Sequence, residues 1–387
     1  MILILFLMPF ILAANNGEAA IAAMPKKITP SSSSMGQRTT IFPPLQNKLQ
    51  TYIRSNGNPI ASVVVVEVAT GNILAMAEGK KSHQWTQVDH SALHARFPAA
   101  SLFKTIVTAT ALEVANFQTK NQLSIQGGCA KVGRHGSWMK ESPTYPHRMT
   151  LKRAFGQSCN GFFAKIAINK IGLGPILHYS KKFGWNQKPI PADFHIPPSP
   201  YLFPQAGSSS ARTVGKFAAG FGYVGISTLH AAWQTLMIAN NGVAKPLKLF
   251  TSSQFSERTY TRIISEDTAQ TLRQLMDATV FRGTANYAFR SGKARRIRHK
   301  IGGKTGTLSG KAPKGIATWF TGIMPLDDPK IIVAAVVVIE DLWKIKGPHL
   351  AAKAFVLYDE LVTEEKATSR PSTFKFIQGL SFQRLSP

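Results

Sequence analysis

Continuous apolar segments and helical repeats occupy different parts of the chain. Residues 61–68 form an unbroken run rich in β-branched side chains, which predicts a buried strand. Residues 73–77 predict a second strand that returns after a turn at 69–72. Strand patterns resume near the other end, at residues 300–308, 316–323 and 331–339. Apolar positions at helical spacing predict further elements at 101–116, 160–171, 174–183, 227–241, 265–281 and 347–362.

This order of patterns predicts an α+β fold. Because the strands come from both ends of the chain and the helices mostly from the middle, we expect one antiparallel β-sheet built from both chain ends and flanked by helices. An all-helical subdomain would be inserted between the two groups of strands. The main domain is predicted to span residues 46–365 and to fold as a single cooperative unit.

The two ends of the chain have other compositions. Residues 1–14 are a short apolar run interrupted by Pro9, shorter than the ~20 residues that cross a bilayer. Residues 1–23 are therefore predicted to be a secretory signal peptide, with an uncleaved N-terminal anchor as the alternative. A Pro- and Ser-rich linker is expected at 24–45 and a polar tail at 366–387. The protein is accordingly expected to be exported, to the periplasm or the outer face of the cytoplasmic membrane of a bacterium.

The formal net charge is +27, and its densest stretch is Arg290–Lys300. Such a charge favours an anionic partner, although a well-solvated basic surface is the simpler interpretation. The basic stretch lacks interleaved aromatic residues and no nucleic-acid-binding module accompanies it. We therefore expect an anionic wall polymer or membrane surface rather than nucleic acid.

The chain has two cysteines, Cys129 and Cys159. In an exported protein they can form a disulfide, but spacing alone does not establish the geometry, and two free thiols are an equal alternative. His90 and His94 have helical spacing without an adjacent glutamate, so no zinc site is predicted. No metal and no other cofactor is expected.

Ser101 and Lys104 are the first candidates for chemistry. They are three residues apart at the start of an apolar helical pattern, which places them on one face of the helix. A serine hydroxyl becomes a nucleophile only when a nearby group accepts its proton, and a desolvated lysine can do this. The same S-x-x-K spacing occurs at Ser137–Lys140 in a Gly/Pro-rich loop and at Ser372–Lys375 in the polar tail. Neither of those contexts buries the lysine.

Two further motifs support Ser101. Ser158-Cys-Asn160 precedes the predicted helix at 160–171, and Lys304-Thr-Gly-Thr307 lies in the predicted strand at 300–308. The three motifs in this order resemble those of the penicillin-binding proteins and serine β-lactamases. The segments 69–76, 97–101 and 220–224 are also similar to that family. The resemblance covers roughly residues 50–365 and is to the penicillin-binding transpeptidase domain.

The resemblance implies a serine acyltransferase that acts on D-alanyl-D-alanine-terminated stem peptides of peptidoglycan. Ser101 would attack the terminal peptide bond and form an acyl-enzyme, and Lys104 would accept its proton. Ser158 would pass a proton to the leaving amine, and Asn160 would contact Lys104 and the substrate. β-Lactams would bind as covalent inhibitors.

The third motif would bind the substrate. Lys304 would provide positive potential for the substrate carboxylate, and the Thr305 and Thr307 hydroxyls would bind it, with Gly306 between them in the substrate-binding strand. The N–H groups of Ser101 and Thr307 would form the oxyanion hole.

Two positions depart from the usual pattern. Cys159 is unusual beside an active site, and Phe221 replaces a polar residue found between two glycines in many relatives. Substrate contacts at Phe221 are therefore open.

Several activities fit this set of motifs. We expect a D,D-transpeptidase, with a D,D-carboxypeptidase as the first alternative because the sequence does not say whether an amine or water accepts the acyl group. A β-lactamase is less favoured because the E-x-x-L-N pattern is missing and the second motif ends in Asn160 rather than valine. A non-catalytic sensor of β-lactams or peptidoglycan is a third alternative.

Overall fold

A computed structural model describes the main domain. The described residues are 38–58, 60–80, 90–126, 128–129, 132, 139, 147–186, 190–202, 210–311, 314–339 and 345–368. The predicted signal peptide or anchor lies outside them, as do the tail beyond residue 368 and both additional S-x-x-K pairs. Within the described part of the chain, no helix has the length and apolar character needed to span a bilayer.

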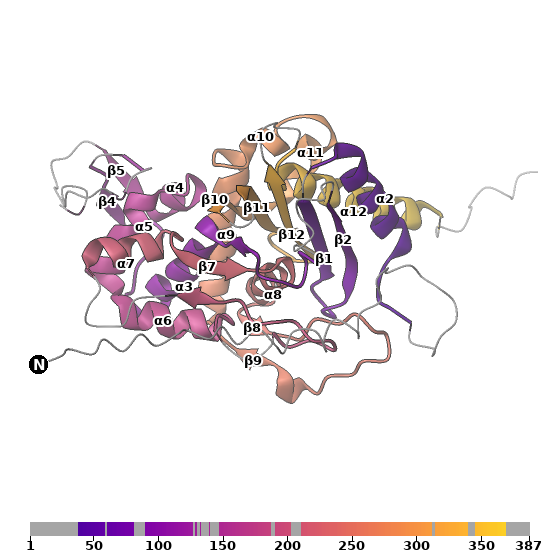
Figure 1. Ribbon diagram of the computed structural model, residues 1–387, viewed down its shortest axis with the longest axis horizontal. Helices are drawn as coiled ribbons and strands as arrows, with labels where there is room; N and C mark the ends of the chain where they lie inside the picture. The colour runs from indigo at the N-terminus through magenta and orange to yellow at the C-terminus, as the bar shows by residue number, and fades with distance from the viewer. Residues whose placement is uncertain are drawn as a thin grey trace, which may run out of the picture.

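A five-stranded antiparallel sheet forms the centre of the molecule, and both ends of the domain contribute to it (Figure 1). Its strand order is β10-β11-β12-β1-β2. The strands are β1 (Ile60–Glu67), β2 (Ile73–Lys80), β10 (Gly302–Lys311), β11 (Lys314–Met324) and β12 (Ile331–Ile339). The predicted α+β fold is confirmed, and so is a sheet built from both chain ends.

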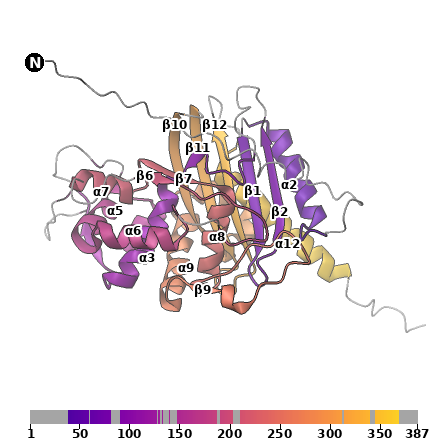
Figure 2. The same ribbon diagram turned by 60° about the horizontal axis from the view of Figure 1, so that its bottom comes forward.

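The two faces of the sheet are covered by different helices (Figure 2). On one face lie α2 (Pro43–Asn56) and α12 (Gly347–Thr368), and on the other α8 (Thr228–Ala239) and α9 (Glu266–Phe281). Alternate residues of a strand point to opposite faces. In β12, Val333 and Val337 therefore pack in the core under α2 and α12, and Ile332 and Val336 pack in the core under α8 and α9. Burial on both faces explains why its sequence is continuously apolar.

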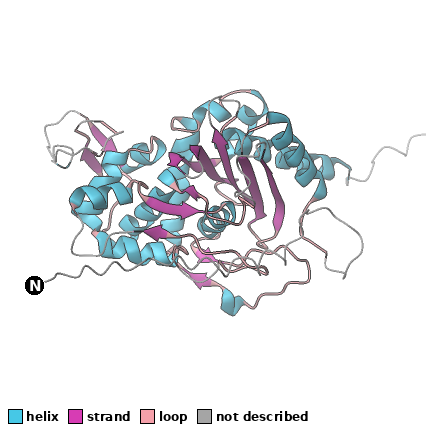
Figure 3. Cartoon of the chain, in the orientation of Figure 1, coloured by secondary structure: helices cyan, strands magenta, loops and turns pink. Residues whose placement is uncertain are grey.

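A lobe of helices lies beside the sheet (Figure 3). It contains α3 (Lys104–Val114), α4 (Leu151–Gly156), α5 (Asn160–Ile166), α6 (Leu173–Lys182) and α7 (Ala211–Ala218), and η4 (Ala167–Ile171) continues α5. The inserted subdomain predicted from the sequence corresponds to this lobe, but it is not all-helical, because β4 (Gln122–Ser124) and β5 (Arg148–Thr150) pair beside α4. Helix α3 is buried over most of its length, as expected from its apolar sequence.

Short elements connect these layers. The paired ones are β3 (Phe97–Pro98), β7 (Tyr223–Ile226) and β6 (Tyr201–Leu202), then β4 (Gln122–Ser124) with β5 (Arg148–Thr150), and β8 (Val243–Ala244) with β9 (Thr261–Arg262). Single turns are formed by η2 (Ala100–Phe103), η5 (Glu257–Thr259), α10 (Asn286–Phe289), α11 (Gly292–Ile297) and η6 (Arg298–Lys300).

The start of the domain differs from the prediction. Residues 43–45 were expected to belong to the linker, but α2 begins at Pro43, and Leu45 is fully buried. Proline fits the first turn of a helix because the N–H that it lacks has no partner within the helix there. Thr39 forms a β-bridge with Phe250, so the packed structure begins still earlier.

Candidate active site

Ser101 lies in the turn η2, which three segments hold in place. The N–H of Ala99 donates to the carbonyl of Val224 in β7 at 2.7 Å, and the indole Nε1 of Trp319 in β11 donates to the carbonyl of Pro98 at 2.9 Å. On its other side, the buried ring of Phe103 contacts aromatic rings of the helical lobe. The serine is therefore fixed between the sheet and the lobe.

Two glycines allow backbone segments to approach this turn closely. A Cβ atom on Gly306 of β10 would lie 2.9 Å from the carbonyl oxygen of Ala99. A Cβ atom on Gly220, which has a φ of +86°, would lie 1.9 Å from the carbonyl oxygen of Ala100. Any larger residue at either position would push its segment away from the serine. The close packing of β10 against the turn that contains Ser101 thus explains why Gly306, the middle residue of the third motif, is a glycine.

Lys104 is the first residue of α3 and is fully buried. Its Nζ lies 2.8 Å from Ser101 Oγ and 2.8 Å from the Ser158 carbonyl oxygen. Two further oxygen atoms, Ser158 Oγ at 3.2 Å and Asn160 Oδ1 at 2.5 Å, complete its surroundings. The amine is therefore in direct contact with the first two motifs.

The second motif forms the junction between α4 and α5. Ser158 has a φ of +56°, a conformation uncommon for a residue with a side chain, and it directs both its carbonyl and its hydroxyl toward Lys104. Cys159 is the N-cap residue of α5 and forms a disulfide with Cys129. Of the two alternatives left open by the sequence, the structure has the disulfide.

Lys304 of β10 also contacts Ser158. Its Nζ donates to Ser158 Oγ at 3.0 Å and to the Thr305 carbonyl at 3.1 Å. The hydroxyl of Ser158 thus bridges the two lysines. The hydroxyl of Thr305 is hydrogen-bonded to that of Thr284, which follows α9. Thr307, two residues further along β10, is exposed.

Burial lowers the pKa of both lysines. The pKa of Lys104 lies well below its ordinary value because the amine is desolvated and, secondarily, because Lys304 is a nearby cation. Desolvation lowers the pKa of Lys304 to about 7. No ion pair with a carboxylate involves either amine in the described part of the chain. Their partners are neutral oxygens and aromatic rings, Phe163 near Lys104 and Phe155 near Lys304.

The structure brings together all residues predicted for catalysis. Ser101, Lys104, Ser158, Asn160 and Lys304 form one connected set of contacts, although they come from three distant parts of the sequence. The three other predicted residues lie in β10 directly after Lys304. Their contact with substrate stays a prediction.

Thr284 is a residue of this site that was not predicted as one. It follows Gly283 in a short loop. The segment Gly283-Thr-Ala285 is similar to the penicillin-binding protein family in sequence, but that similarity alone did not assign a role to Thr284. Its side chain also lies 3.4 Å from the carbonyl of Gly156 at the end of α4.

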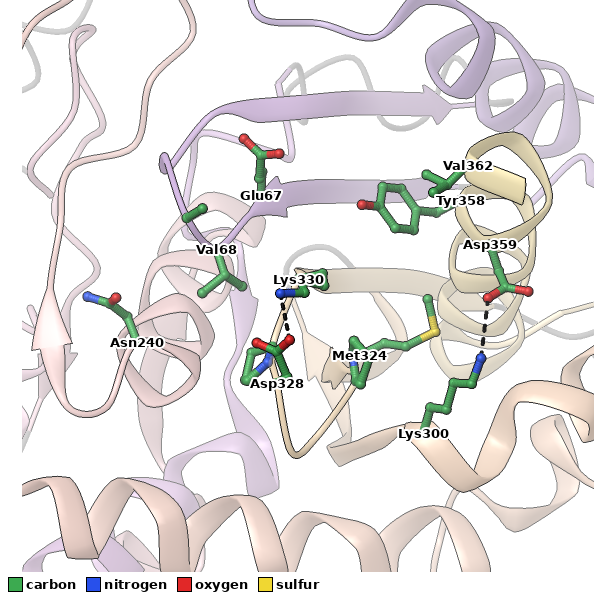
Figure 4. A pocket seen from close by; sticks show the side chains of 13 residues that line it. Glu67, Val68, Asn240, Lys300, Met324, Asp328, Lys330, Tyr358, Asp359 and Val362 are labelled. Atoms are coloured by element: carbon green, nitrogen blue, oxygen red, sulfur yellow. Dashed lines mark ion pairs between the residues drawn. The ribbon is translucent and has the colours of Figure 1, made fainter. Parts of the chain in front are cut away.

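A separate cavity of about 500 Å³ lies where β1 and β11 end and β12 begins (Figure 4). It is lined by apolar side chains and by two ion pairs, Lys330–Asp328 at 2.6 Å and Lys300–Asp359 at 3.9 Å. None of the motif residues lines it, so we do not assign it to the substrate. Over the described residues, no group of three or more His, Cys, Asp and Glu side chains is arranged to hold a metal ion.

Comparison with protein families identifies the domain. The model of the penicillin-binding protein transpeptidase domain matches residues 61–355, which is most of the chain. The chain belongs to this family. The matched range contains Ser101–Lys104, Ser158–Asn160 and Lys304–Thr307.

Curated relatives of this transpeptidase domain are distant. The chain is 24% identical over 320 residues to penicillin-binding protein PbpB of Mycolicibacterium smegmatis, covering 75% of this chain and 47% of the relative. It is 25% identical over 347 residues to peptidoglycan D,D-transpeptidase PbpA of the same organism, covering 77% of this chain and 66% of the relative. The chain thus spans about half to two thirds of the length of these relatives.

Solved structures have the same fold as this transpeptidase domain. The transpeptidase domain of penicillin-binding protein 3 from Burkholderia pseudomallei has a TM-score of 0.68 at 18% identity, with 88% of this chain and 99% of that chain covered. Penicillin-binding protein A from Mycobacterium tuberculosis, solved as its ceftriaxone acyl-enzyme complex, has a TM-score of 0.63 at 22% identity, with 83% and 78% covered.

Proposed function

We propose that the protein is a D,D-transpeptidase that cross-links peptidoglycan through an acyl-enzyme on Ser101. The observation that carries this proposal is the contact between Ser101 Oγ and the buried amine of Lys104, whose pKa is well below its ordinary value. A lowered pKa raises the share of the lysine that is neutral, and the neutral amine can accept the proton of a nucleophile. The family and the names of the relatives support the choice of substrate.

The contacts of Lys104 support its role as the base. Four oxygen atoms lie within 3.2 Å of its Nζ, but a neutral amine has only two N–H groups and one lone pair. The backbone carbonyl oxygen of Ser158 and the side-chain amide oxygen of Asn160 can only accept, so the two N–H groups of the amine donate to them. The lone pair is then free for a hydroxyl, and Ser101 at 2.8 Å is the nearer one. In the neutral form, Ser101 therefore donates its proton toward Lys104.

Ser158 and Lys304 support the release of the leaving group. As the peptide bond breaks, the departing amine needs a proton. Ser158 Oγ touches both lysines, so a proton taken by Lys104 has a path through this hydroxyl. Because desolvation brings the pKa of Lys304 to about 7, that amine can give a proton to Ser158 and regain it near neutral pH.

The start of β10 is suited to the substrate carboxylate and to the developing oxyanion. Lys304, Thr305 and Thr307 offer an amine and two hydroxyls within four residues of one strand. Because Gly306 lets β10 approach η2 closely, the N–H groups of Thr307 and Ser101 can serve as paired donors. Each such donor is typically worth about 3–4 kcal/mol in the transition state.

The covalent step is tested with a fluorescent penicillin. We expect the full chain to be labelled, and the label to be absent from Ser101→Ala and present on Ser180→Ala. Ser180 lies on α6, and its buried hydroxyl donates to the Ile176 carbonyl, which makes it a matched control. A labelled Ser101→Ala protein would overturn the assignment.

The acceptor is tested by product analysis. A D-alanyl-D-alanine pentapeptide is incubated with the full chain, with and without a second peptide that carries a free amine. A transpeptidase forms the cross-linked product when the amine is present. Release of D-alanine at the same rate in both reactions, without a cross-linked product, would show the alternative D,D-carboxypeptidase.

We also propose that the protein acts outside the cytoplasm. The Cys129–Cys159 disulfide supports this because such bonds persist mainly in oxidising compartments. The basic stretch from Arg290 to Lys300 is largely exposed and is our candidate for contact with an anionic wall polymer or membrane surface. Weaker binding of Arg295→Glu/Arg296→Glu than of Lys181→Glu/Lys182→Glu to anionic vesicles or wall polymer would support this site, and equal binding would exclude it.

A further inference from the structure

We propose that the Cys129–Cys159 disulfide positions the catalytic loop and that its reduction slows acylation of Ser101. The inference rests on the proposed function, because acylation is the property that it controls. It assigns the bond a role in the chemistry in addition to stabilising the fold.

One half of the bond lies inside the second motif. Cys159 is fully buried, and its neighbours on either side, Ser158 and Asn160, both contact the amine of Lys104. A displacement of Cys159 along the chain therefore moves two of the groups that surround the catalytic base. The uncommon positive φ of Ser158 needs support from its surroundings, and the disulfide is attached to the next residue.

The other half of the bond caps the helix that carries Asn160. The side chain of Cys159, the N-cap residue, accepts no hydrogen bond from α5. The first N–H groups of a helix need acceptors from elsewhere. The carbonyl of Cys129 provides one: it accepts from the N–H of Asn160 at 2.8 Å and from that of Gly161 at 3.4 Å. The residue that forms the covalent bond thus also holds the backbone of Asn160.

The chain before Cys129 runs close to the start of α5. A Cβ atom on Gly161 would lie 3.4 Å from the carbonyl oxygen of Gly128, which is an ordinary van der Waals distance. The side chain of Cys129 packs against the hydrophobic core, and its Sγ lies 3.9 Å from Met149 Sδ. A contact between two sulfur atoms is weak, so Cys129 is linked to the loop by the covalent bond together with the two hydrogen bonds that its carbonyl accepts.

Reduction by a dithiol follows ordinary thiol–disulfide exchange. A thiolate of the reductant attacks Cys129 Sγ, since Cys129 is the less buried partner, and the Cys129–Cys159 bond breaks as Cys159 leaves as a thiolate that takes up a proton. The second thiol of the reductant then releases Cys129. The protein disulfide gains two electrons and two protons, and the dithiol is oxidised to a disulfide. Cys129 is then no longer covalently attached to the loop that carries Ser158 and Asn160.

Dithiothreitol is a suitable probe because the chain has two cysteines and they form this one bond. We expect the rate of acylation by a fluorescent penicillin to fall at least tenfold in the reduced full chain and to recover after reoxidation. The Cys129→Ala/Cys159→Ala variant should be slow in both buffers and should not respond to dithiothreitol. An unchanged rate in the reduced protein would overturn the inference.

The pH profile distinguishes positioning from a general loss of stability. If the loop loosens, water reaches Lys104, desolvation weakens and its pKa rises toward the ordinary value. The rising limb of the acylation rate should then move to higher pH in the reduced protein. Leu357→Ala, on α12 and buried in the core that this helix forms with the sheet, is the control for lost stability. It should unfold more easily but keep the rate and the pH profile of the native protein.

The remaining outcomes separate this inference from the proposed function. If the reduced protein loses activity only in proportion to its unfolding, as Leu357→Ala would, the bond is a stabilising link alone and the inference fails. If the oxidised protein is not labelled at Ser101 at all, the proposed function fails first. Normal labelling of the oxidised protein and equal labelling of the reduced protein would overturn the inference alone.

Discussion

Strands β12 and β10 belong to the same sheet but have opposite characters. All nine residues of β12 are apolar and buried, and the strand is paired on both sides. Strand β10 lies at the edge, and its first half is made of glycine, threonine and a lysine. The central strand β12 packs in both hydrophobic cores, whereas the edge strand β10 places Lys304 and two threonines near the turn that contains Ser101. Stability and chemistry are therefore carried by different strands, and mutations should separate them.

The largest expected effect is on the rate. Lys104→Ala should slow acylation by ~100-fold or more because the proton acceptor is removed. The protein should remain folded, since the core strands are not touched. The acylation rate is measured with the fluorescent penicillin and the fold by circular dichroism. Unchanged acylation would remove Lys104 as the base.

The opposite result is expected in β12. Ile332→Ala should lower the free energy of unfolding by about 2–5 kcal/mol because it leaves a cavity in the core between β12 and α8. The folded fraction should acylate at the native rate. Chemical denaturation measures the first quantity and penicillin labelling below the unfolding transition the second. A loss of rate in the folded protein would mean that the two strands are not independent.

A smaller effect concerns Lys304 and pH. Its pKa is about 7 in the folded protein and ordinary, near 10.5, when unfolded, so the unfolded chain binds more protons between these values. Stability contributed through this group therefore rises with pH, by ~2 kcal/mol between pH 7 and 9. Lys304→Met should lack this rise. Parallel stability curves for the two proteins over that range would contradict the low pKa.

The smallest effect is expected from His230, which is buried in α8. Burial lowers its pKa from 6.5 to about 4, and its Nδ1 has no hydrogen-bond partner among the described residues. The folded state therefore binds fewer protons, and stability is lost as the pH falls from about 6.5 toward 4. From pH 7 to 5 the loss is on the order of 1–2 kcal/mol. We expect His230→Gln to reduce this acid dependence. An equal loss of stability in both proteins would exclude His230 as its source.

The strands and buried helices could be predicted because burial on both faces leaves a continuous apolar sequence, as in β12 and α3. Helix α2 was missed because it is amphipathic and polar overall, with only four buried residues, and begins with two prolines that resemble a linker. Residues 43–56 form a helix because their few buried side chains pack against the sheet, and this packing is not visible in the sequence.

The candidate site was predicted from three short motifs, whose residue types are those the chemistry needs. The role of Thr284 was not visible, since its importance depends on its distance to Thr305 in space. The disulfide was left open for the same reason, because the separation of two cysteines in space does not follow from their separation along the chain.

The strand order of the sheet has a consequence for timing. Strands β1 and β2 lie near the start of the domain, whereas β10, β11 and β12 are synthesised only in its last quarter. In the sheet, β1 pairs with both β2 and β12. Ser101 and Lys104 thus exist as a nascent chain long before Lys304 and the edge strand that borders them. Closing pairs so distant in sequence is slow, and the sheet cannot form without them. The contacts between the three motifs therefore form only after almost the whole domain has been synthesised.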